Sequence, residues 1–265
     1  MTAAAWQTGS HFHIPPASLA LGRVTLAGAE ARHLLGPRRV RVGEPVLLAD
    51  HEGRIGRACL LEGSGATAVL EVHEIVTVPR PQPAVTVVQA ILPAEAGSQA
   101  VALMTEVGVD AVVPWQASRS VATWTRERQG RDRWQASAHE ATKVSGRPYP
   151  PTIAEPVTLG ALTSAIGRAA WALLLDPGAV RSLPAELAAG AAEPSDVTLV
   201  IGPEGGFTAE EAAALGDAGA RPVRLGPTIL RSRHAGAIAA ALVLAKVRWQ
   251  PPGVVGGGGD GRLGP

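Results

Sequence analysis

The stretch Leu199-Val-Ile-Gly-Pro-Glu-Gly-Gly-Phe-Thr208 decides the fold of this 265-residue chain. It has the pattern of a buried strand that runs into a glycine turn, and Thr208 with the acidic residues after it predicts a capped helix. A second segment, Leu225-Gly-Pro-Thr-Ile-Leu-Arg-Ser-Arg-His-Ala235, repeats this arrangement about twenty residues later. Glycine lets the backbone approach a ligand closely. The two turns therefore predict one small-ligand site at the carboxyl edge of a parallel sheet.

Other interpretations of the two turns stay open on spacing alone. The first turn lacks the Gly-Lys-Ser/Thr ending of a P-loop and does not fit the Rossmann glycine pattern. An ordinary strand-to-helix turn is as consistent with it as a ligand loop. In the second turn, Arg231 is suited to contact a phosphate or a base, or to orient a carboxylate. An exposed arginine that caps a helix fits that position equally well.

Outward from these turns, strands and helices are predicted to alternate after residue 83. The apolar runs are typical of strands buried on both faces, and the alternation is typical of an α/β domain with a mainly parallel sheet. The predicted strands cover residues 84–92, 110–114, 170–175, 198–201 and 222–225. The predicted helices cover residues 97–107, 131–145, 182–189, 209–218 and 235–248.

The first 75 residues have a different pattern. Short strands at 24–26, 45–49, 56–61 and 66–72, separated by glycines, predict a small antiparallel barrel or sandwich. The proline-rich segment 78–83 is a stiff connector, so we expect a domain boundary there. We expect an N-terminal domain at residues 1–78, a C-terminal domain at 79–250 and a disordered glycine-rich tail at 251–265.

Composition excludes several classes of site. The net charge is only +1, so nucleic-acid binding requires local basic patches. The single cysteine, Cys59, excludes an intramolecular disulfide framework and a cysteine-based zinc cluster. The seven histidines show no metal-ligand spacing, and no Gly-x-Ser-x-Gly motif is present. We therefore expect neither a metal site nor a hydrolase.

The sequence also bears on the membrane. The N-terminus has no basic segment followed by an apolar run, and the longest apolar stretch, 235–245, is too short to cross a bilayer. We expect a soluble cytoplasmic protein without a membrane partner.

Two groups of basic residues predict an RNA-binding surface. One extends from Arg119 to Arg147 with Trp124, Trp134 and Tyr149 interleaved, which suits phosphate contact and base stacking. The other lies near residues 32–41. A single charge run is more often a solvated helix face, but two runs in two domains favour RNA binding. The predicted RNA-binding residues are Arg32, His33, Arg38, Arg39, Arg119, Arg133 and Arg147.

Together these segments resemble the RsmE-type 16S rRNA uridine-N3 methyltransferases of the SPOUT superfamily. The resemblance covers most of residues 10–248 and begins with His11-Phe12 and the segment 33–44. Its strongest matches are Ile201-Gly-Pro-Glu-Gly-Gly-Phe207 and Leu225-Gly226 with Ile229-Leu-Arg231.

The resemblance implies an N-terminal PUA-like β-barrel, a SPOUT domain with a deep trefoil knot, and a homodimer. It implies S-adenosylmethionine as the cofactor and the 16S rRNA of the 30S ribosomal subunit as the partner. Arg231 would stabilise the charge that develops on the uridine, and Glu204 is a weaker candidate for a base or orienting group. The implied cofactor-binding residues are Leu175, Ile201, Gly202, Pro203, Gly205, Gly206, Leu225, Gly226, Ile229, Leu230 and Ser232.

Two departures from the family pattern leave an alternative open. After Arg231 the family commonly has Thr-x-Thr-Ala, whereas this chain has Ser232-Arg-His-Ala235, which brings the imidazole of His234 near the expected pocket. Val144 stands where the family has a glutamine. The alternative is a divergent SPOUT protein that binds RNA or cofactor without catalysis, or that methylates a different RNA position.

Overall fold

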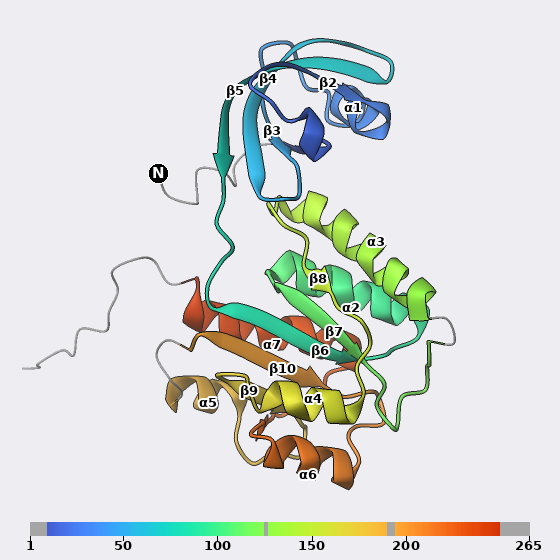
Figure 1. The fold of residues 1–265 in the computed structure, drawn as a ribbon, viewed down its shortest axis with the longest axis vertical. Coiled ribbons are helices and arrows are strands. Elements are labelled where there is room, and N and C mark those ends of the chain that lie inside the picture. The colour runs from blue at the N-terminus through green and yellow to red at the C-terminus, as the bar shows by residue number, and fades with distance from the viewer. Residues whose placement is uncertain (1–9, 125–126, 190–193, 250–265) are drawn as a thin grey trace, which may run out of the picture.

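The computed structural model describes residues 10–124, 127–189 and 194–249, which form two sheets with separate hydrophobic cores (Figure 1). We call residues 10–77 the N-terminal unit and residues 84–249 the C-terminal unit. The proline-rich segment 78–83 connects them. The predicted disordered tail at 251–265 lies outside the described residues.

The N-terminal unit contains one five-stranded sheet in the order β1-β3-β4-β5-β2. Strand β1 pairs with β3 in parallel and the other pairs are antiparallel. Among the described residues the outer strands β1 and β2 do not pair with each other, so the sheet is open and does not form the predicted barrel. The elements are β1 (His11–His13), the 3-10 turn Pro16–Ser18, β2 (Gly22–Ala27), α1 (Gly28–Leu35), β3 (Pro45–Ala49), β4 (Arg54–Ser64) and β5 (Thr67–Thr77).

The C-terminal unit is built on a six-stranded parallel sheet in the order β11-β9-β10-β6-β7-β8. Its strands are β6 (Ala84–Ala90), β7 (Ala111–Trp115), β8 (Thr152–Ile153), β9 (Ala172–Leu175), β10 (Asp196–Ile201) and β11 (Arg221–Val223). Side chains along each strand alternate between two cores: Leu173 and Leu175 enter one, whereas Ala172 and Leu174 enter the other. Burial on both faces explains why these strands are apolar throughout.

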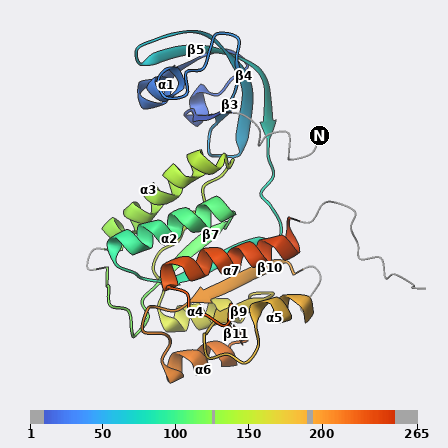
Figure 2. The ribbon, with the colours of Figure 1, turned by 180° about the vertical axis from the view of Figure 1, so that it is seen from behind.

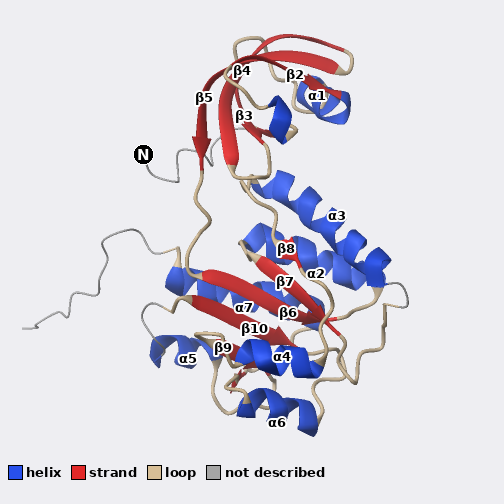
Figure 3. Cartoon of the chain, in the orientation of Figure 1, coloured by secondary structure: helices blue, strands red, loops and turns tan. Residues whose placement is uncertain are grey.

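Helices cover both faces of this sheet (Figures 2 and 3). One core contains residues of α2, α3, α5 and α7, and the opposite core contains residues of α4 and α6. The helices are α2 (Ala94–Val107), α3 (Glu127–Ser145), α4 (Leu159–Ile166), α5 (Leu183–Ala189), α6 (Ala209–Asp217) and α7 (Ser232–Val247). None of the helices in the described ranges is long and apolar enough to cross a membrane.

The two units meet where α3 approaches the N-terminal sheet (Figure 1). The hydroxyl of Tyr149 donates to the Val78 carbonyl at 2.7 Å, and Lys143 forms an ion pair with Glu30 at 3.3 Å. A Cβ on Gly53 would lie 1.9 Å from the Tyr149 hydroxyl oxygen. Only glycine therefore fits at Gly53, since its φ of +103° is also unfavourable for other residues.

The same junction contains a rigid histidine. His51 has a φ of +61° and stacks on His13 with ring centroids 4.4 Å apart. Asp50 fixes the turn, because its Oδ1 accepts the backbone N–H groups of Glu52 and Arg54 at 2.8 and 2.9 Å. Burial, and then the charges of His13, His139 and Lys143, lower the pKa of His51 to about 4.

The lowered pKa of His51 predicts a pH dependence of stability. Because the pKa in the unfolded chain is near 6.5, the unfolded state takes up a proton that the folded state refuses between about pH 6.5 and 4. The free energy of unfolding should fall as the pH drops through this window. His51→Asn tolerates the positive φ and should lose less stability over the same window in urea titrations. Equal losses in the variant and the wild type would contradict this assignment.

Candidate functional site

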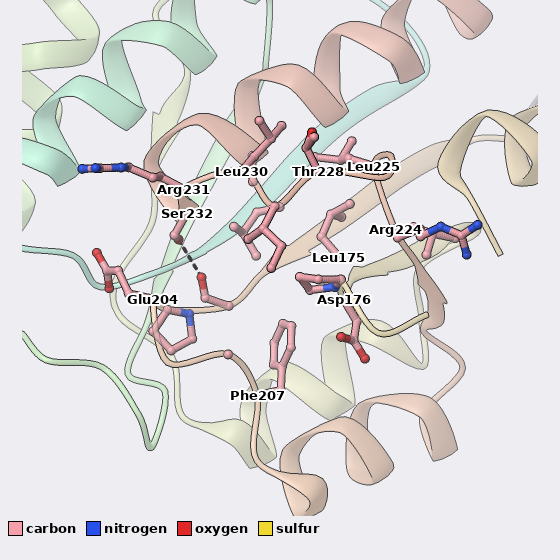
Figure 4. A pocket seen from close by; sticks show the side chains of 18 of the residues that line it. Leu175, Asp176, Glu204, Phe207, Arg224, Leu225, Thr228, Leu230, Arg231 and Ser232 are labelled. Carbon is pink, nitrogen blue, oxygen red and sulfur yellow. Dashed lines mark hydrogen bonds between the residues drawn. The ribbon is translucent and has the colours of Figure 1, made fainter. Parts of the chain in front are cut away.

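A cavity of about 290 Å³ lies at the carboxyl ends of the neighbouring strands β10, β9 and β11 (Figure 4). This is the edge at which open parallel sheets bind ligands. Three segments form its walls: the ends of β9 and β10 with the turns that follow them, and the segment from β11 into α7. The lining residues are Leu175, Asp176, Pro177, Ile201, Gly202, Pro203, Glu204, Gly206, Phe207, Val223, Arg224, Leu225, Gly226, Thr228, Ile229, Leu230, Arg231, Ser232 and Ala235.

The first glycine turn is fixed by aromatic packing beneath it. Trp115, fully buried at the end of β7, donates its indole N–H to the Ile201 carbonyl at 3.1 Å and stacks on Phe207. A Cβ on Gly202 would lie 3.0 Å from the Phe207 ring. Glycine at this position thus lets Phe207 fold back under the turn and form part of the cavity wall.

A helix cap braces the same turn from its other side. The carboxylate of Glu211 accepts the backbone N–H groups of Thr208 at 2.9 Å and Ser118 at 2.7 Å. Burial by itself would raise the pKa of Glu211, but these two hydrogen bonds, with the Ser118 side chain and the charge of Arg119, outweigh it, and the pKa lies below its ordinary value. Glu211 is therefore a buried carboxylate that holds the start of α6 against the segment after β7.

The serine at the start of α7 links the two turns. Ser232 is buried, and its hydroxyl donates to the Gly202 carbonyl at 2.6 Å (Figure 4). The same oxygen accepts a hydrogen bond from Nε2 of Gln89 at 3.0 Å, and Gln89 is itself fully buried on β6. The family resemblance gives Ser232 a cofactor contact. Here its hydroxyl connects strand β6, the first turn and helix α7.

The Ser232→Ala variant should therefore destabilise the protein and widen the cavity. It leaves the Gly202 carbonyl without this donor, and an unsatisfied buried group costs about 1–3 kcal/mol. We expect the free energy of unfolding in urea to fall by that amount, and ligand affinity at the cavity to weaken with it. Ser164→Ala is the matched control, because Ser164 makes a similar bond to the Gly160 carbonyl on an exposed helix. Equal effects of the two substitutions would contradict the linking role.

Two polar side chains lie at one side of the cavity. Figure 4 shows the side chains of Glu204 and Arg231 on the same side, away from Asp176 and Arg224 at the other end. Both residues are exposed, and Arg231 is the residue immediately before α7. Within the described residues neither side chain forms an ion pair, so both remain available to a ligand.

The structure brings nearly all the predicted cofactor-binding residues to this cavity. The exception is Gly205, which does not line it and packs against Arg119 instead. Sequence reasoning missed Asp176, Phe207, Arg224 and Thr228. Phe207 stood inside the quoted motif and could have been included. Arg224 could not be predicted from the sequence, because its position depends on a distant contact. Its guanidinium donates to the Ala179 carbonyl at 2.8 Å, in the loop after β9.

Neither departure from the family pattern enters the cavity. His234 lies in the first turn of α7 but does not line the cavity, and its Nε2 is 3.2 Å from Nε of Arg233. Val144 lies on α3 and is 82% exposed. His234 is thus close to the cavity, as a neighbour of its lining residues, but does not form part of the wall.

The structure corrects part of the predicted RNA surface. Arg147 has a side chain only 14% exposed, and its Nη1 donates to the carbonyls of Thr105 and Val109 at 2.8 and 2.7 Å. Burial lowers its pKa to about 10, so it remains charged at neutral pH and pairs with Asp110. Trp134 is fully buried in the core. Neither side chain is available to RNA, because Trp134 packs in the hydrophobic core and the guanidinium of Arg147 is buried by its hydrogen bonds to backbone carbonyls.

The other predicted RNA-binding residues have mixed surroundings. Arg119 is exposed but donates to the carbonyls of Gly205 and Phe207 at 3.2 and 3.1 Å, so it supports the first turn. The remaining five are exposed: Arg32, His33, Arg38, Arg39 and Arg133. No group of three His, Cys, Asp or Glu side chains within the described ranges is arranged to hold a metal ion.

Comparison with known proteins gives a consistent family. Residues 79–244 match the model of the RNA methyltransferase domain family. The chain is 37% identical over 230 residues to ribosomal RNA small subunit methyltransferase E of Mycobacterium bovis, covering 84% of this chain and 86% of that protein. The Mycobacterium tuberculosis protein of the same name matches equally.

Solved structures share the fold across nearly the whole chain. A ribosomal RNA small subunit methyltransferase E of Neisseria gonorrhoeae, solved with S-adenosyl methionine, has a TM-score of 0.75 at 24% identity and covers 91% of this chain and 98% of its own. A methyltransferase of Legionella pneumophila, solved with the same cofactor, also has a TM-score of 0.75, at 23% identity, covering 90% and 98%.

Proposed function

Because the chain belongs to the ribosomal RNA small subunit methyltransferase E family, we propose that it transfers a methyl group from S-adenosylmethionine to 16S rRNA. The observation that carries the proposal is the cavity itself. Its walls are the two glycine turns on which the family resemblance rests, and they lie at the ligand-binding edge of a parallel sheet.

The lining of the cavity fits this cofactor. Leu175, Ile201 and Leu225 provide apolar surface for a flat base, and the turn at Gly202–Gly206 brings backbone groups within reach of polar atoms. Relatives solved with the cofactor share the fold, which supports this assignment. When bound, the cofactor would supply a methyl group from its sulfonium sulfur, which would leave as a neutral thioether.

The protein's own residues then have two tasks. The nucleophile, which we propose to be N3 of a uridine, is an imide nitrogen that must lose its proton and meet the methyl group in line. Arg231, at the mouth of the cavity, stabilises the negative charge that develops on the base. Glu204 lies on the same side and orients the base or accepts its proton. The base must reach the cavity unstacked, which loops of RNA permit.

The finer family features are also part of the proposal. We propose a domain boundary after residue 78, a PUA-like N-terminal domain, a trefoil knot around the second turn, and a cytoplasmic homodimer. Exposed apolar side chains on α7 support the dimer: Ile238 and Leu242 are 41% and 36% exposed. Light scattering measures the mass in solution, and a monomer at micromolar concentration would contradict the dimer.

Two measurements test the function. Calorimetric titration with S-adenosylmethionine should show saturable binding to one site per chain. Mass spectrometry of 16S rRNA from a deletion strain should show the loss of one methyluridine that the restored gene returns. Absence of cofactor binding would leave a degenerate RNA-binding protein. Cofactor binding without methylation of 30S subunits would mean a different RNA position.

A further inference from the structure

A second cavity, of about 210 Å³, lies between the two units and outside the site described above. It is lined by segments from four parts of the chain: the β3–β4 turn, the connector, α3 and the segment that leads into β8. Its lining residues are His51, Arg80, Arg131, Gln135, Ala138, His139, Pro150, Pro151, Thr152 and Ile153. We call it the interdomain cleft.

The charge of the cleft has one sign. Its lining contains two arginines, two histidines and an amide, but no carboxylate. Two carboxylates lie beside the lining: Asp50 is adjacent to His51, and Glu155, whose side chain is 70% exposed, pairs with Arg131. An exposed ion pair contributes little free energy, so a bound anion can compete with Glu155 for Arg131.

The two arginines and the neutral ring of His51 are held in place. Arg80 stacks over the ring of Tyr149, with the guanidinium carbon 4.3 Å from the ring centroid, and Tyr149 is itself anchored to Val78. Nε of Arg131 donates to the Ile153 carbonyl at 3.1 Å. His51 is fixed by the turn at Asp50 and by its stacking on His13. Guanidinium groups fixed in this way are suited to bind the oxygens of a phosphate.

His51 lies in a locally positive environment. Besides burial, the positive charges of His13, His139 and Lys143 lower its pKa, and only Asp50 opposes them. A bound anion would offset this positive potential. Of the groups in the cleft, Arg80 is exposed on the connector, so a ligand can reach it from solvent.

We propose that the interdomain cleft binds a phosphate group of the RNA backbone, with Arg80 and Arg131 as its cationic contacts and His51 and His139 beside them. A strand bound there touches the N-terminal unit through the β3–β4 turn and the C-terminal unit through α3. That the phosphate belongs to an RNA rests on the proposed function. That the cleft binds a phosphate group rests on its lining residues alone.

Charge reversal at Arg80 tests the proposal on the full-length protein. The probe is a single-stranded oligouridylate of about twelve nucleotides, with affinity measured by fluorescence anisotropy at several salt concentrations. Arg80→Glu should weaken binding at least about tenfold near 0.1 M salt, and the slope of log affinity against log salt should shrink by about 0.7, the value for one phosphate contact on single strands. Arg168→Glu is the matched control: this exposed arginine follows α4, on the opposite face of the parallel sheet, and should change affinity less than twofold. Equal affinities and slopes for Arg80→Glu and wild type would overturn the proposal.

Histidine resonances give a second readout that needs no variant. In protein labelled with ¹⁵N-histidine, the side-chain signals of His51 and His139 should shift when the oligonucleotide is added, whereas His73, exposed on β5, should not. Inorganic phosphate at millimolar concentration should produce the same shifts more weakly. Shifts with phosphate but not with RNA would overturn the RNA source, and no shift with either would overturn the site. Calorimetry with S-adenosylmethionine is run alongside, because its failure would overturn the proposed function while leaving the test of the cleft intact.

Discussion

The Arg231→Ala variant is expected to transfer methyl groups to 30S subunits about 10²–10³-fold more slowly than the wild type, with cofactor affinity and fold intact. The reason is that a positive charge in the cavity lining would stabilise the negative charge of the transition state more than the ground state. Arg231 is exposed and, in the described part of the chain, makes no ion pair, so its removal leaves no buried group unsatisfied. Single-turnover methylation with a labelled methyl group measures the rate. Calorimetry measures the cofactor affinity, and thermal melting checks that the fold is intact.

The neighbouring arginine provides the matched control. Arg233 is two residues further on, and its Nε contacts His234 rather than the cavity. Arg233→Ala should keep a near-normal rate, and Arg231→Lys should recover part of the lost rate because it retains the charge without the guanidinium geometry. A near-normal rate in Arg231→Ala would remove the catalytic assignment and leave the residue as an exposed helix cap.

The Asp110→Ala variant is expected to lose about 3–5 kcal/mol of the free energy of unfolding. The carboxylate of Asp110 pairs with Arg248 and with Arg147, 3.8 Å away, and accepts the Val85 backbone N–H at 2.8 Å. The three charged side chains are only 10–16% exposed. Removing the carboxylate leaves two buried guanidinium groups without a counter-charge, which is the costly way to break a buried ion pair.

Urea denaturation followed by circular dichroism measures this loss. Asp132→Ala is the control, because Asp132 is exposed on α3 and substitutions at such positions usually change stability by less than about 0.5 kcal/mol. If Asp110→Ala lost less than 1 kcal/mol, the three-residue cluster would be a surface feature rather than a buried junction. Arg248 also donates to the Pro83 carbonyl at 2.8 Å, so the variant should also loosen the C-terminal end of α7.

Sequence patterns predicted the regular parts of this fold well. The strand at residues 45–49 agrees with β3 to the residue, and every predicted strand and helix after residue 83 has a counterpart in the structure. The helix α4 was missed although its signals were present. Thr158 caps it by accepting the Ala161 N–H, and Leu162 and Ile166 form its buried face. Period and capping are local properties, so the sequence alone carries them.

Short or weakly patterned elements could not be predicted. Strands β1 and β8 have three and two residues, too few to show alternation. Helix α1 buries only Ala31 and Leu34 and begins at a glycine with a φ of +70°. These short strands form because they pair with strands that are distant in the sequence; β1, for example, pairs with β3 in parallel. A short stretch of sequence does not reveal such pairing.

The site shows the same division. The two turns were recognisable because glycine and proline mark them in the sequence, whereas the roles of the arginines were not. Arg147 belonged to a basic run, yet its ion-pair partner Asp110 lies 37 residues away, and Asp110 also pairs with Arg248 near the end of the described chain. Sequence gives the charge of such a residue, but burial decides whether that charge faces a ligand or the core.

Because the chain is synthesised from its N-terminus, the position of α7 in the sequence determines when the cavity can form. This helix is the last described element, and its first turn contributes Ser232 and Ala235 to the cavity and a bond to Gln89, 143 residues earlier. A chain synthesised only as far as β11 contains every strand of the parallel sheet but lacks the helix that completes the cavity. The cavity is therefore the last part of this unit that can form.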